Sequence, residues 1–364
     1  MKRGLMEWNK LELPEEELAG RVAAVRAKMA QGGMDAILAY GDNYQAGDLS
    51  YLSNFSPYWF DGMLVLTRES DVLLTTLSAR VHSWIKGLSP VSEVRSTKSL
   101  GREAAEWLKE RNVERGRIGV TRLGRLPNGI YGAFREVLPN SEVVDATALV
   151  EDLRVIPSRA EVGLLSKAAR MSADALQYAF EESLQGRKQC EVVAEIEHRL
   201  RYGGAEDLLV LIASGKAPGK WPAMATEERI EGATLVRAIC AYKGHWAEVG
   251  WTLPGSSKAA QEANVELLAR FEQARELMRA GKSVGEVVSK LRESYGNGGV
   301  EMGAVAPYTA LPDVEGEWSD ELPIPLGAVV VLRAGLQTPE GVRAFHSDTF
   351  LIDANGPVRL SASE

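Results

Sequence analysis

The sequence has 364 residues, with 42 Lys and Arg against 50 Asp and Glu, so its formal net charge is −8. Proteins bind phosphate backbones through clustered cationic side chains, so this acidic balance argues against a nucleic-acid partner. Hydrophobic residues make up 45% and charged residues 25% of the chain, which excludes disordered and fibrous classes. At roughly 100–200 residues per domain, the length predicts two domains.

The sequence also carries signals about its compartment. Two cysteines, Cys190 and Cys240, cannot supply a disulfide framework for a chain of this length, which favours a reducing environment. Charged residues interrupt the first 13 positions, so no signal peptide is expected. No run reaches the roughly 20 apolar residues that a membrane span needs. We therefore expect a cytoplasmic protein without membrane contact.

The first half of the chain alternates helical and extended patterns. Apolar residues recur at three- and four-residue steps from Glu15 to Ala30, which predicts a helix that Gly32-Gly33 ends. The other expected elements are strands at 34–40, 62–67 and 71–76, helices at 78–86 and 102–110, and strands at 117–120 and 142–144. Charged turn residues between the second and third strands predict a hairpin. Such alternation is typical of an α/β domain.

The second half is expected to be α+β, with paired helices packed on a sheet. Residues 145–159 have the pattern of a connection, and a charged, alanine-rich helix is expected from Ala160 to Leu184. The following elements are expected to be a helix at 190–202, strands at 208–213, 233–242 and 246–253, helices at 258–280 and 284–295, and strands at 328–332 and 344–353. We set the two domains at residues 1–155 and 156–364.

The order of several short segments resembles the creatinase and Xaa-Pro aminopeptidase family, M24. The segments are R-V-A-A-V-R-A-K-M from Arg21, M-D-A-I-L-A-Y from Met34, Y-L-S-N-F from Tyr51, the junction from Val144 to Leu176, and F-H-S-D-T-F-L-I from Phe345. The resemblance spans nearly the whole chain. It implies an α+β protein with an N-terminal ribonuclease-H-like α/β domain and a C-terminal pita-bread domain, which is a duplicated α-α-β arrangement around a concave sheet.

The resemblance raises the question of a metal centre. Most members are dinuclear-metal peptidases whose ligands are two Asp, one His and two Glu, whereas creatinase cleaves a C–N bond without metal. Placed on this chain, the family pattern puts these ligands at Ala238, at Glu248, between Tyr295 and Asp313 where no His occurs, at Arg333 and at Ser347. Since a two-metal site needs about five oxygen and nitrogen ligands, we expect no metal and no other cofactor.

Without a metal centre, few residues remain as candidates for catalysis. A metal-free hydrolase needs a base, an acid and donors for the developing oxyanion, and histidine is the usual proton carrier near neutral pH. The resemblance places His245 and His346 on strands that flank the lost metal site, although either could be a structural histidine. Glu248 is the candidate base or substrate anchor, and Asp348 is a candidate to orient His346 or to cap a strand turn.

Three further residues are candidates for substrate binding. Arg333 could hold a substrate carboxylate bidentately, or it could form a salt bridge with Glu248 across the emptied site. Trp221 could form an aromatic wall of the pocket or belong to an ordinary core. Arg343 lies near the pocket by sequence, or it is a solvated loop residue.

These observations leave three functions open. The favoured hypothesis is a metal-independent, creatinase-like hydrolase that cleaves a C–N bond of a small, carboxylate-bearing substrate. The alternatives are a metal-dependent Xaa-Pro peptidase with unrecognised ligands and a non-catalytic binding protein on a decayed M24 fold. A pocket closed by an Arg333–Glu248 pair favours the last. The family precedent also implies a homodimer, in which Tyr58, Trp59 and Phe60 are candidate lid residues over the partner's pocket.

Overall fold

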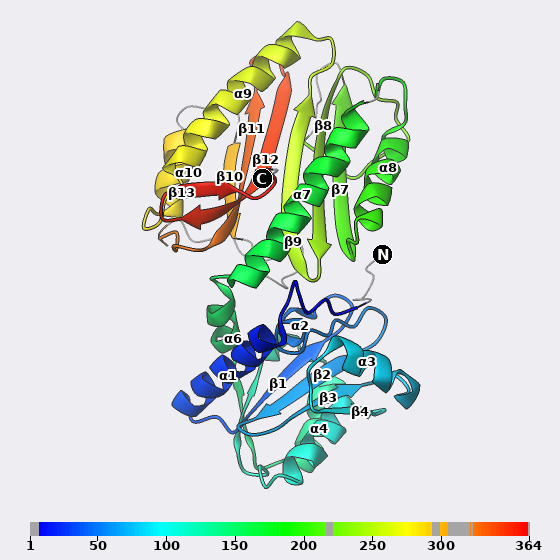
Figure 1. The fold of residues 1–364 in the computed structure, drawn as a ribbon, viewed down its shortest axis with the longest axis vertical. Helices are drawn as coiled ribbons and strands as arrows, with labels where there is room; N and C mark the ends of the chain where they lie inside the picture. The colour runs from blue at the N-terminus through cyan, green and yellow to red at the C-terminus, as the bar shows by residue number, and fades with distance from the viewer. Residues whose placement is uncertain are drawn as a thin grey trace. The chain divides into compact units, whose positions relative to one another are not determined.

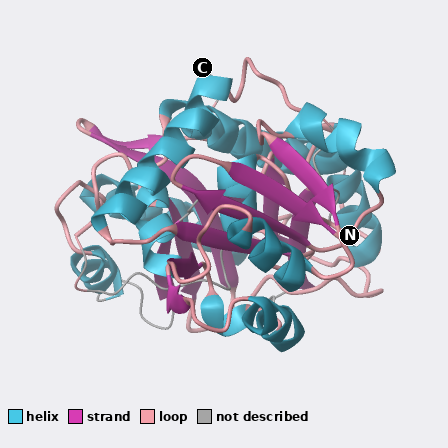
Figure 2. Ribbon diagram, turned by 90° about the horizontal axis from the view of Figure 1, so that it is seen from below, coloured by secondary structure: helices cyan, strands magenta, loops and turns pink. Residues whose placement is uncertain are grey.

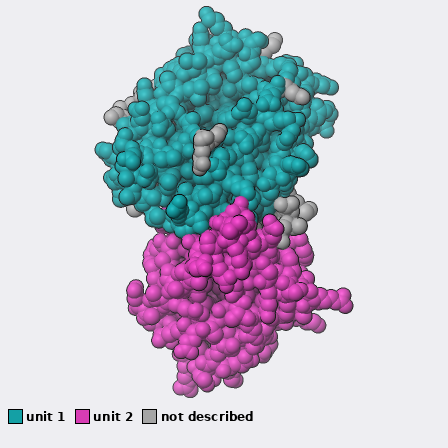
Figure 3. Space-filling model, in the orientation of Figure 1, with its two compact units in different colours: residues 1, 156–306, 311–364 teal, residues 2–155, 307–310 magenta. Residues whose placement is uncertain are grey.

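The computed structural model describes residues 7–181, 183–215, 221–292, 299–304, 321 and 323–362. The chain forms two compact units, one that ends at Val155 and one that starts at Ile156 (Figure 3). Both units contain helices and strands, which Figure 2 distinguishes by colour. Within the described ranges, no helix is both long enough and apolar enough to span a membrane.

The N-terminal unit is built on a six-stranded sheet with the order β4-β3-β2-β1-β5-β6 (Figure 1). The expected hairpin is confirmed, because β2 (Gly62–Thr67) and β3 (Asp71–Thr75) pair antiparallel. Strand β1 (Ala36–Gly41) pairs antiparallel with β2 and parallel with β5. The other strands and helices are α1 (Glu15–Gln31), α2 (Gly47–Ser53), α3 (His82–Leu88), β4 (Glu93–Ser96), α4 (Leu100–Lys109), β5 (Arg117–Val120), α5 (Asn128–Val137), β6 (Glu142–Asp145) and α6 (Thr147–Arg154).

Helices bury both faces of this sheet, which explains the uninterrupted apolar runs of its central strands. Ile37 of β1 belongs to a buried cluster with residues of α1, α2 and α6. Its neighbour Leu38 belongs to a second cluster on the other face, with Trp107 of α4 and Phe134 of α5. Successive side chains of a strand point to opposite faces, so a strand buried on both sides cannot show polar alternation.

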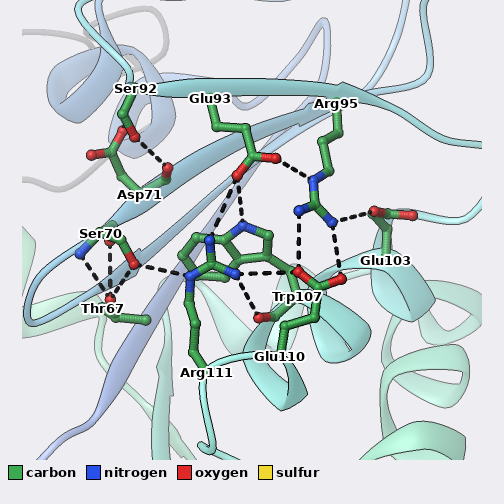
Figure 4. A network of polar contacts seen from close by, with 10 residues as sticks. All are labelled: Thr67, Ser70, Asp71, Ser92, Glu93, Arg95, Glu103, Trp107, Glu110 and Arg111. Atoms are coloured by element: carbon green, nitrogen blue, oxygen red, sulfur yellow. Dashed lines mark hydrogen bonds and ion pairs between the residues drawn. The ribbon is translucent and has the colours of Figure 1, made fainter.

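A polar network fastens helix α4 to the edge strand β4 (Figure 4). Trp107 Nε1 donates a hydrogen bond to Glu93 Oε2 at 3.0 Å, and the Arg111 guanidinium lies 3.5 Å from the centroid of the Trp107 ring. Arg95 donates to Glu93 and, from Nη2, to Glu110 Oε2 at 3.1 Å. Every group of the network contacts another side chain of the same unit, so we assign it a structural role.

The C-terminal unit is built on a seven-stranded sheet with the order β10-β11-β12-β9-β8-β7, and β13 pairs with β12. Its elements are α7 (Arg159–Glu181), α8 (Gln189–Tyr202), β7 (Asp207–Gly215), β8 (Ala233–Tyr242), β9 (His245–Leu253), α9 (Lys258–Leu277), α10 (Val284–Arg292), β10 (Gly299–Ala304), β11 (Val329–Gln337), β12 (Arg343–Asp353) and β13 (Gly356–Arg359). The long helices α7 and α9 cross the sheet on the same side, α7 over β8 and β9 and α9 over β11 and β12 (Figure 1).

The sequence prediction differs from the structure in short elements. Residues 145–159, expected to be a connection, contain helix α6, whose Val150 is buried in the N-terminal core. Helix α9 ends at Leu277 rather than at residue 280, because Met278 has an extended backbone. The expected end of the last helix at Tyr295 lies outside the described residues. Short segments of this kind carry too few turns to show a clear apolar period.

Two threonines bridge the central seam of the C-terminal sheet. Strands β9 and β12 pair directly at Ser347. Beyond it, Thr349 Oγ1 accepts a hydrogen bond from the Glu248 backbone N–H at 3.0 Å and donates to the Glu248 carbonyl at 2.9 Å. Thr252 makes the equivalent pair of bonds to the Phe345 backbone, at 2.7 and 2.9 Å. The hydroxyls therefore satisfy buried backbone groups where the strands diverge.

Thr349→Val is expected to lower the free energy of unfolding by about 2–4 kcal/mol, because it leaves a buried N–H and a buried carbonyl of Glu248 without this partner. Urea unfolding followed by circular dichroism measures the change. Thr76→Val, at an exposed position of the N-terminal unit, is the control and is expected to change the value by less than about 0.5 kcal/mol. Equal stability of the two variants would show that the hydroxyl bridge is unimportant.

Candidate functional site

The C-terminal sheet separates the candidate residues onto two faces. His245 points toward α7, where its Nε2 lies 3.6 Å from Oε1 of Glu161. Glu248 is three positions further along β9 and therefore points to the opposite face. His346 of β12 also points to the helices, because its ring packs edge-on against Phe271 of α9 with centroids 4.4 Å apart. We call the face that carries Glu248 the inner face.

The centre of the inner face is an ion cluster of three residues from three strands. Arg333 of β11 donates from Nε to Glu248 Oε1 at 3.0 Å and from Nη2 to Oε2 at 2.8 Å. Arg237 of β8 donates from Nη2 to Glu248 Oε2 at 2.7 Å. The Glu248 side chain is fully buried, and the two arginine side chains are 10% and 11% exposed. The predicted Arg333–Glu248 pair is thus present, with a second guanidinium added.

The two guanidinium groups keep the Glu248 carboxylate ionised. Burial alone would raise the pKa of Glu248, but Arg333 and Arg237 outweigh it and lower the pKa to about 2. A carboxylate with so low a pKa is a weak base at neutral pH. Two guanidinium groups thus share one carboxylate. This arrangement makes Glu248 an ion-pair anchor rather than a proton acceptor.

The structure corrects the position of the first expected metal ligand. Ala238 lies opposite Val249 and points toward the helices, whereas Arg237 lies opposite Gly250 on the inner face. The hairpin between β8 and β9 has the two-residue turn Lys243-Gly244, and both turn residues have positive φ. Counting residues back from this turn places Arg237 beside Glu248, and this signal was available in the sequence.

The inner face does not fit a dinuclear metal centre. Arg237, Arg333 and Ser347 supply no anionic ligand, and two guanidinium groups repel a divalent cation. In the part of the chain that the structure describes, no group of three or more His, Cys, Asp or Glu could hold a metal ion. The stretch from Tyr295 to Asp313, where the family pattern has its histidine, lies outside the described side chains and contains no His in the sequence.

The structure does not bring the predicted proton carriers to Glu248. His245 and His346 both face the helices, on the opposite side of the sheet from Glu248. The expectation that they flank the site on the inner face is therefore corrected. His245 Nδ1 donates to the Lys243 carbonyl at 2.8 Å, which fixes its ring. Burial lowers the pKa of His346 to about 4, so this histidine is neutral at pH 7. Both have the surroundings of packing histidines.

Asp348 shares the helix-side face with His346 and does not orient it. Its Oδ2 accepts a hydrogen bond from the Ser361 hydroxyl at 2.8 Å and lies 3.2 Å from Nε of Arg359. Burial raises the pKa of Asp348 to about 6 despite the neighbouring cation. These contacts tie β12 to β13 and the C-terminal residues, so the catalytic assignment of Asp348 is also corrected.

His346→Gln is expected to reduce the loss of stability in acid. The folded-state pKa of about 4 lies below the ordinary value of 6.5, so the unfolded chain takes up the proton first as the pH falls. This group contributes stability above pH 6.5 that is lost as the pH falls through 4, on the order of 3 kcal/mol. Urea unfolding at pH 7 and pH 4 measures it. His198→Gln, at an exposed histidine, should keep the wild-type dependence, and the same dependence in His346→Gln would contradict the assignment.

The structure does bring Trp221 and Arg343 to the inner face. The Trp221 ring lies over Gly335 of β11, where a Cβ atom would stand 2.5 Å from the indole. Gly335 is two residues from Arg333 and therefore shares its face. Arg343 lies over the Trp221 ring at 5.2 Å from the centroid, and its Nε donates to Gln337 Oε1 at 3.1 Å. Two of the three predicted substrate-binding residues are thus in contact with each other.

Both units match known domains. Residues 21–156 match the creatinase/prolidase N-terminal domain, and residues 163–354 match metallopeptidase family M24. The chain therefore belongs to metallopeptidase family M24. This confirms the expected fold class, an N-terminal creatinase-type domain followed by a pita-bread domain.

The relatives include enzymes named as Xaa-Pro peptidases. The Xaa-Pro dipeptidase of Pyrococcus horikoshii is 25% identical over 352 residues, which cover 92% of this chain and 95% of that protein. The crystal structure of the prolidase from Pyrococcus horikoshii OT3 has a TM-score of 0.77 at 22% identity and covers 95% of this chain and 99% of its own. The X-Pro aminopeptidase structure from Thermotoga maritima has a TM-score of 0.80 at 17% identity, with 91% and 96% covered. At these identities the structural matches establish the fold.

Proposed function

We propose that this protein is a ligand-binding member of family M24 that does not carry out metal-dependent hydrolysis. The observation that carries the proposal is the buried cluster of Arg237, Glu248 and Arg333. In this cluster, the carboxylate of Glu248 is the partner of two cations. Of the three hypotheses drawn from the sequence, this is the binding protein on a decayed M24 fold.

The proposed ligand class is a small, carboxylate-bearing, peptide-like molecule. A relative that matches over almost the full length is named an Xaa-Pro dipeptidase, and Xaa-Pro dipeptides end in a carboxylate. We also propose that the protein is a cytoplasmic homodimer, and size-exclusion chromatography with light scattering measures its mass in solution.

The comparisons favour a metal-dependent peptidase over the metal-independent, creatinase-like hydrolase. The named relatives are Xaa-Pro peptidases, and the family model is that of a metallopeptidase. A metal-independent hydrolase would also need a proton carrier on the inner face, but His245 and His346 both face the helices. The second candidate function is therefore a metal-dependent Xaa-Pro peptidase, which the full-length relationship favours and the residues on the inner face oppose.

One experiment separates binding from metal-dependent hydrolysis. The protein is incubated with glycyl-proline in the presence of Mn²⁺ or Co²⁺ and, separately, of a chelator, and released proline is measured. Isothermal titration of glycyl-proline in chelator measures binding. We expect binding without proline release under both conditions. Proline release that needs the metal would establish the peptidase, and release in chelator would establish the metal-independent hydrolase.

A further inference from the structure

A pocket of about 310 Å³ is formed by α7 and α8 of the C-terminal unit. Small-molecule sites in proteins begin at about this size, at roughly 300 Å³. Most of the wall comes from one flank of α8, because residues three and four apart are neighbours on a helix surface. The lining residues are Tyr178 of α7 and Glu195, His198, Arg199 and Tyr202 of α8. We call this the α7–α8 pocket.

Arg199 supplies a positive charge to the α7–α8 pocket. Its guanidinium lies over the Tyr178 ring, 3.3 Å from the centroid, so stacking orients it. In the described residues, no carboxylate forms an ion pair with Arg199. The carboxylate of Glu195 is instead paired with Arg187, whose Nη2 donates to its Oε2 at 2.7 Å. A stacked guanidinium keeps its edge N–H groups for hydrogen bonds, so the pocket favours an anion.

The lining of the α7–α8 pocket is rich in hydrogen-bond donors. The side chains of Tyr178, Tyr202 and His198 can each donate, in addition to that of Arg199. In the part of the chain that the structure describes, neither tyrosine hydroxyl nor the His198 ring is hydrogen-bonded to another residue. A phosphate group offers three strong acceptor oxygens, whereas a carboxylate offers two. The lining therefore matches a phosphate better than a carboxylate.

Tyr202 adds an aromatic ring at the end of α8. The residue is 85% exposed, although tyrosine is a large and partly apolar side chain. The His198 ring lies beside it, with the centroids 6.5 Å apart and the planes tilted by 32°. Exposed aromatic rings of this kind stack planar heterocycles such as nucleobases.

We propose that the α7–α8 pocket binds a small molecule in which a planar heterocycle is joined to a phosphate, as in a nucleoside monophosphate. Arg199 and His198 donate to the phosphate oxygens, and the Tyr202 ring stacks on the heterocycle. The pocket shares no residue with the ion cluster on the inner face. The proposal therefore goes beyond the binding function proposed above and does not depend on it.

Three probes test the two halves of the site by isothermal titration at pH 7. Adenosine 5′-monophosphate carries both the heterocycle and the phosphate, adenosine lacks the phosphate, and ribose 5-phosphate lacks the heterocycle. We expect the wild-type protein to bind the monophosphate at least tenfold more tightly than either of the others. Arg199→Gln is expected to remove the preference for the monophosphate over adenosine. Tyr202→Ala is expected to remove the preference for the monophosphate over ribose 5-phosphate.

Matched controls keep the test specific. Tyr44→Ala removes an aromatic side chain that is 86% exposed, and Arg80→Gln removes an exposed arginine; both lie in the N-terminal unit and should leave binding unchanged. If Arg199→Gln does not fold, Arg199→Lys replaces it, with a smaller loss of the same preference because lysine keeps the charge without the planar fork.

Three results would overturn the proposal. The first is failure of the wild-type protein to bind adenosine 5′-monophosphate, and the second is wild-type affinity in the Arg199 and Tyr202 variants. The third is competition by saturating glycyl-proline, which would place the monophosphate on the inner face. Equal affinity for the monophosphate and ribose 5-phosphate would overturn the role of Tyr202. None of these results bears on whether glycyl-proline binds by itself, so the proposed function is tested separately.

Discussion

Glu248→Gln is expected to lower the free energy of unfolding by about 3–5 kcal/mol, because it removes a buried carboxylate that pairs with two nearly buried guanidinium groups. The neutral amide can replace some hydrogen bonds but not the charge. Urea unfolding at pH 7 measures the difference. Glu266→Gln removes a carboxylate from a surface pair with Arg270 and should cost less than about 1 kcal/mol.

The same variant has a predictable pH dependence. The folded-state pKa of Glu248, about 2, lies below the ordinary value of 4.5. The charge therefore contributes stability that is fully present above pH 4.5 and is lost as the pH falls toward 2. The difference in stability between the wild-type protein and Glu248→Gln should shrink over this range. A constant difference, or a cost below about 1 kcal/mol at pH 7, would show that the cluster does not stabilise the fold.

A variant with restored ligands is expected to gain metal-dependent stability. Arg237→Asp, Glu248→Asp, Arg333→Glu and Ser347→Glu together place four carboxylates on adjacent strands of the inner face. Four close carboxylates repel one another without a cation, so Mn²⁺ should raise the melting temperature of this variant. At a metal concentration of 100 times Kd, the gain is about 2.7 kcal/mol. Differential scanning fluorimetry with and without chelator measures it.

The wild-type protein is the control for the restored variant. Its own guanidinium groups already neutralise Glu248, so neither Mn²⁺ nor chelator should change its melting temperature. Folding of the variant only in the presence of Mn²⁺ would support the same conclusion. Stoichiometric divalent ions in the freshly isolated wild-type protein, with a lower melting temperature after their removal, would contradict it.

The family and the absence of most metal ligands were readable from the residues. Ligand chemistry depends on residue type, and Arg333 and Ser347 cannot replace glutamates whatever their surroundings. The hairpin of β2 and β3 was also predictable, because charged turn residues separate two apolar runs. The long helix α7 was predictable because it is long enough to show a helical apolar period.

The roles of individual residues at the site could not be predicted in the same way. His346 and Ser347 are neighbours in the sequence, yet one packs on Phe271 and the other lies on the inner face. A shift of one residue in a strand reverses the face, so the face is decided by the register of strand pairing. The placement of Ala238 instead of Arg237 on the inner face was the same kind of error.

Composition and residue order were sufficient for the class of fold and for the conclusion that a dinuclear centre lacks its ligands. The partners of Arg333 and Arg343 needed three-dimensional contacts. Arg333 is engaged by Glu248, which is 85 positions away in the chain, and Arg343 is held against Trp221 by the pairing of β11 with β12. Such contacts depend on which strands become neighbours, and no local pattern in the sequence records that.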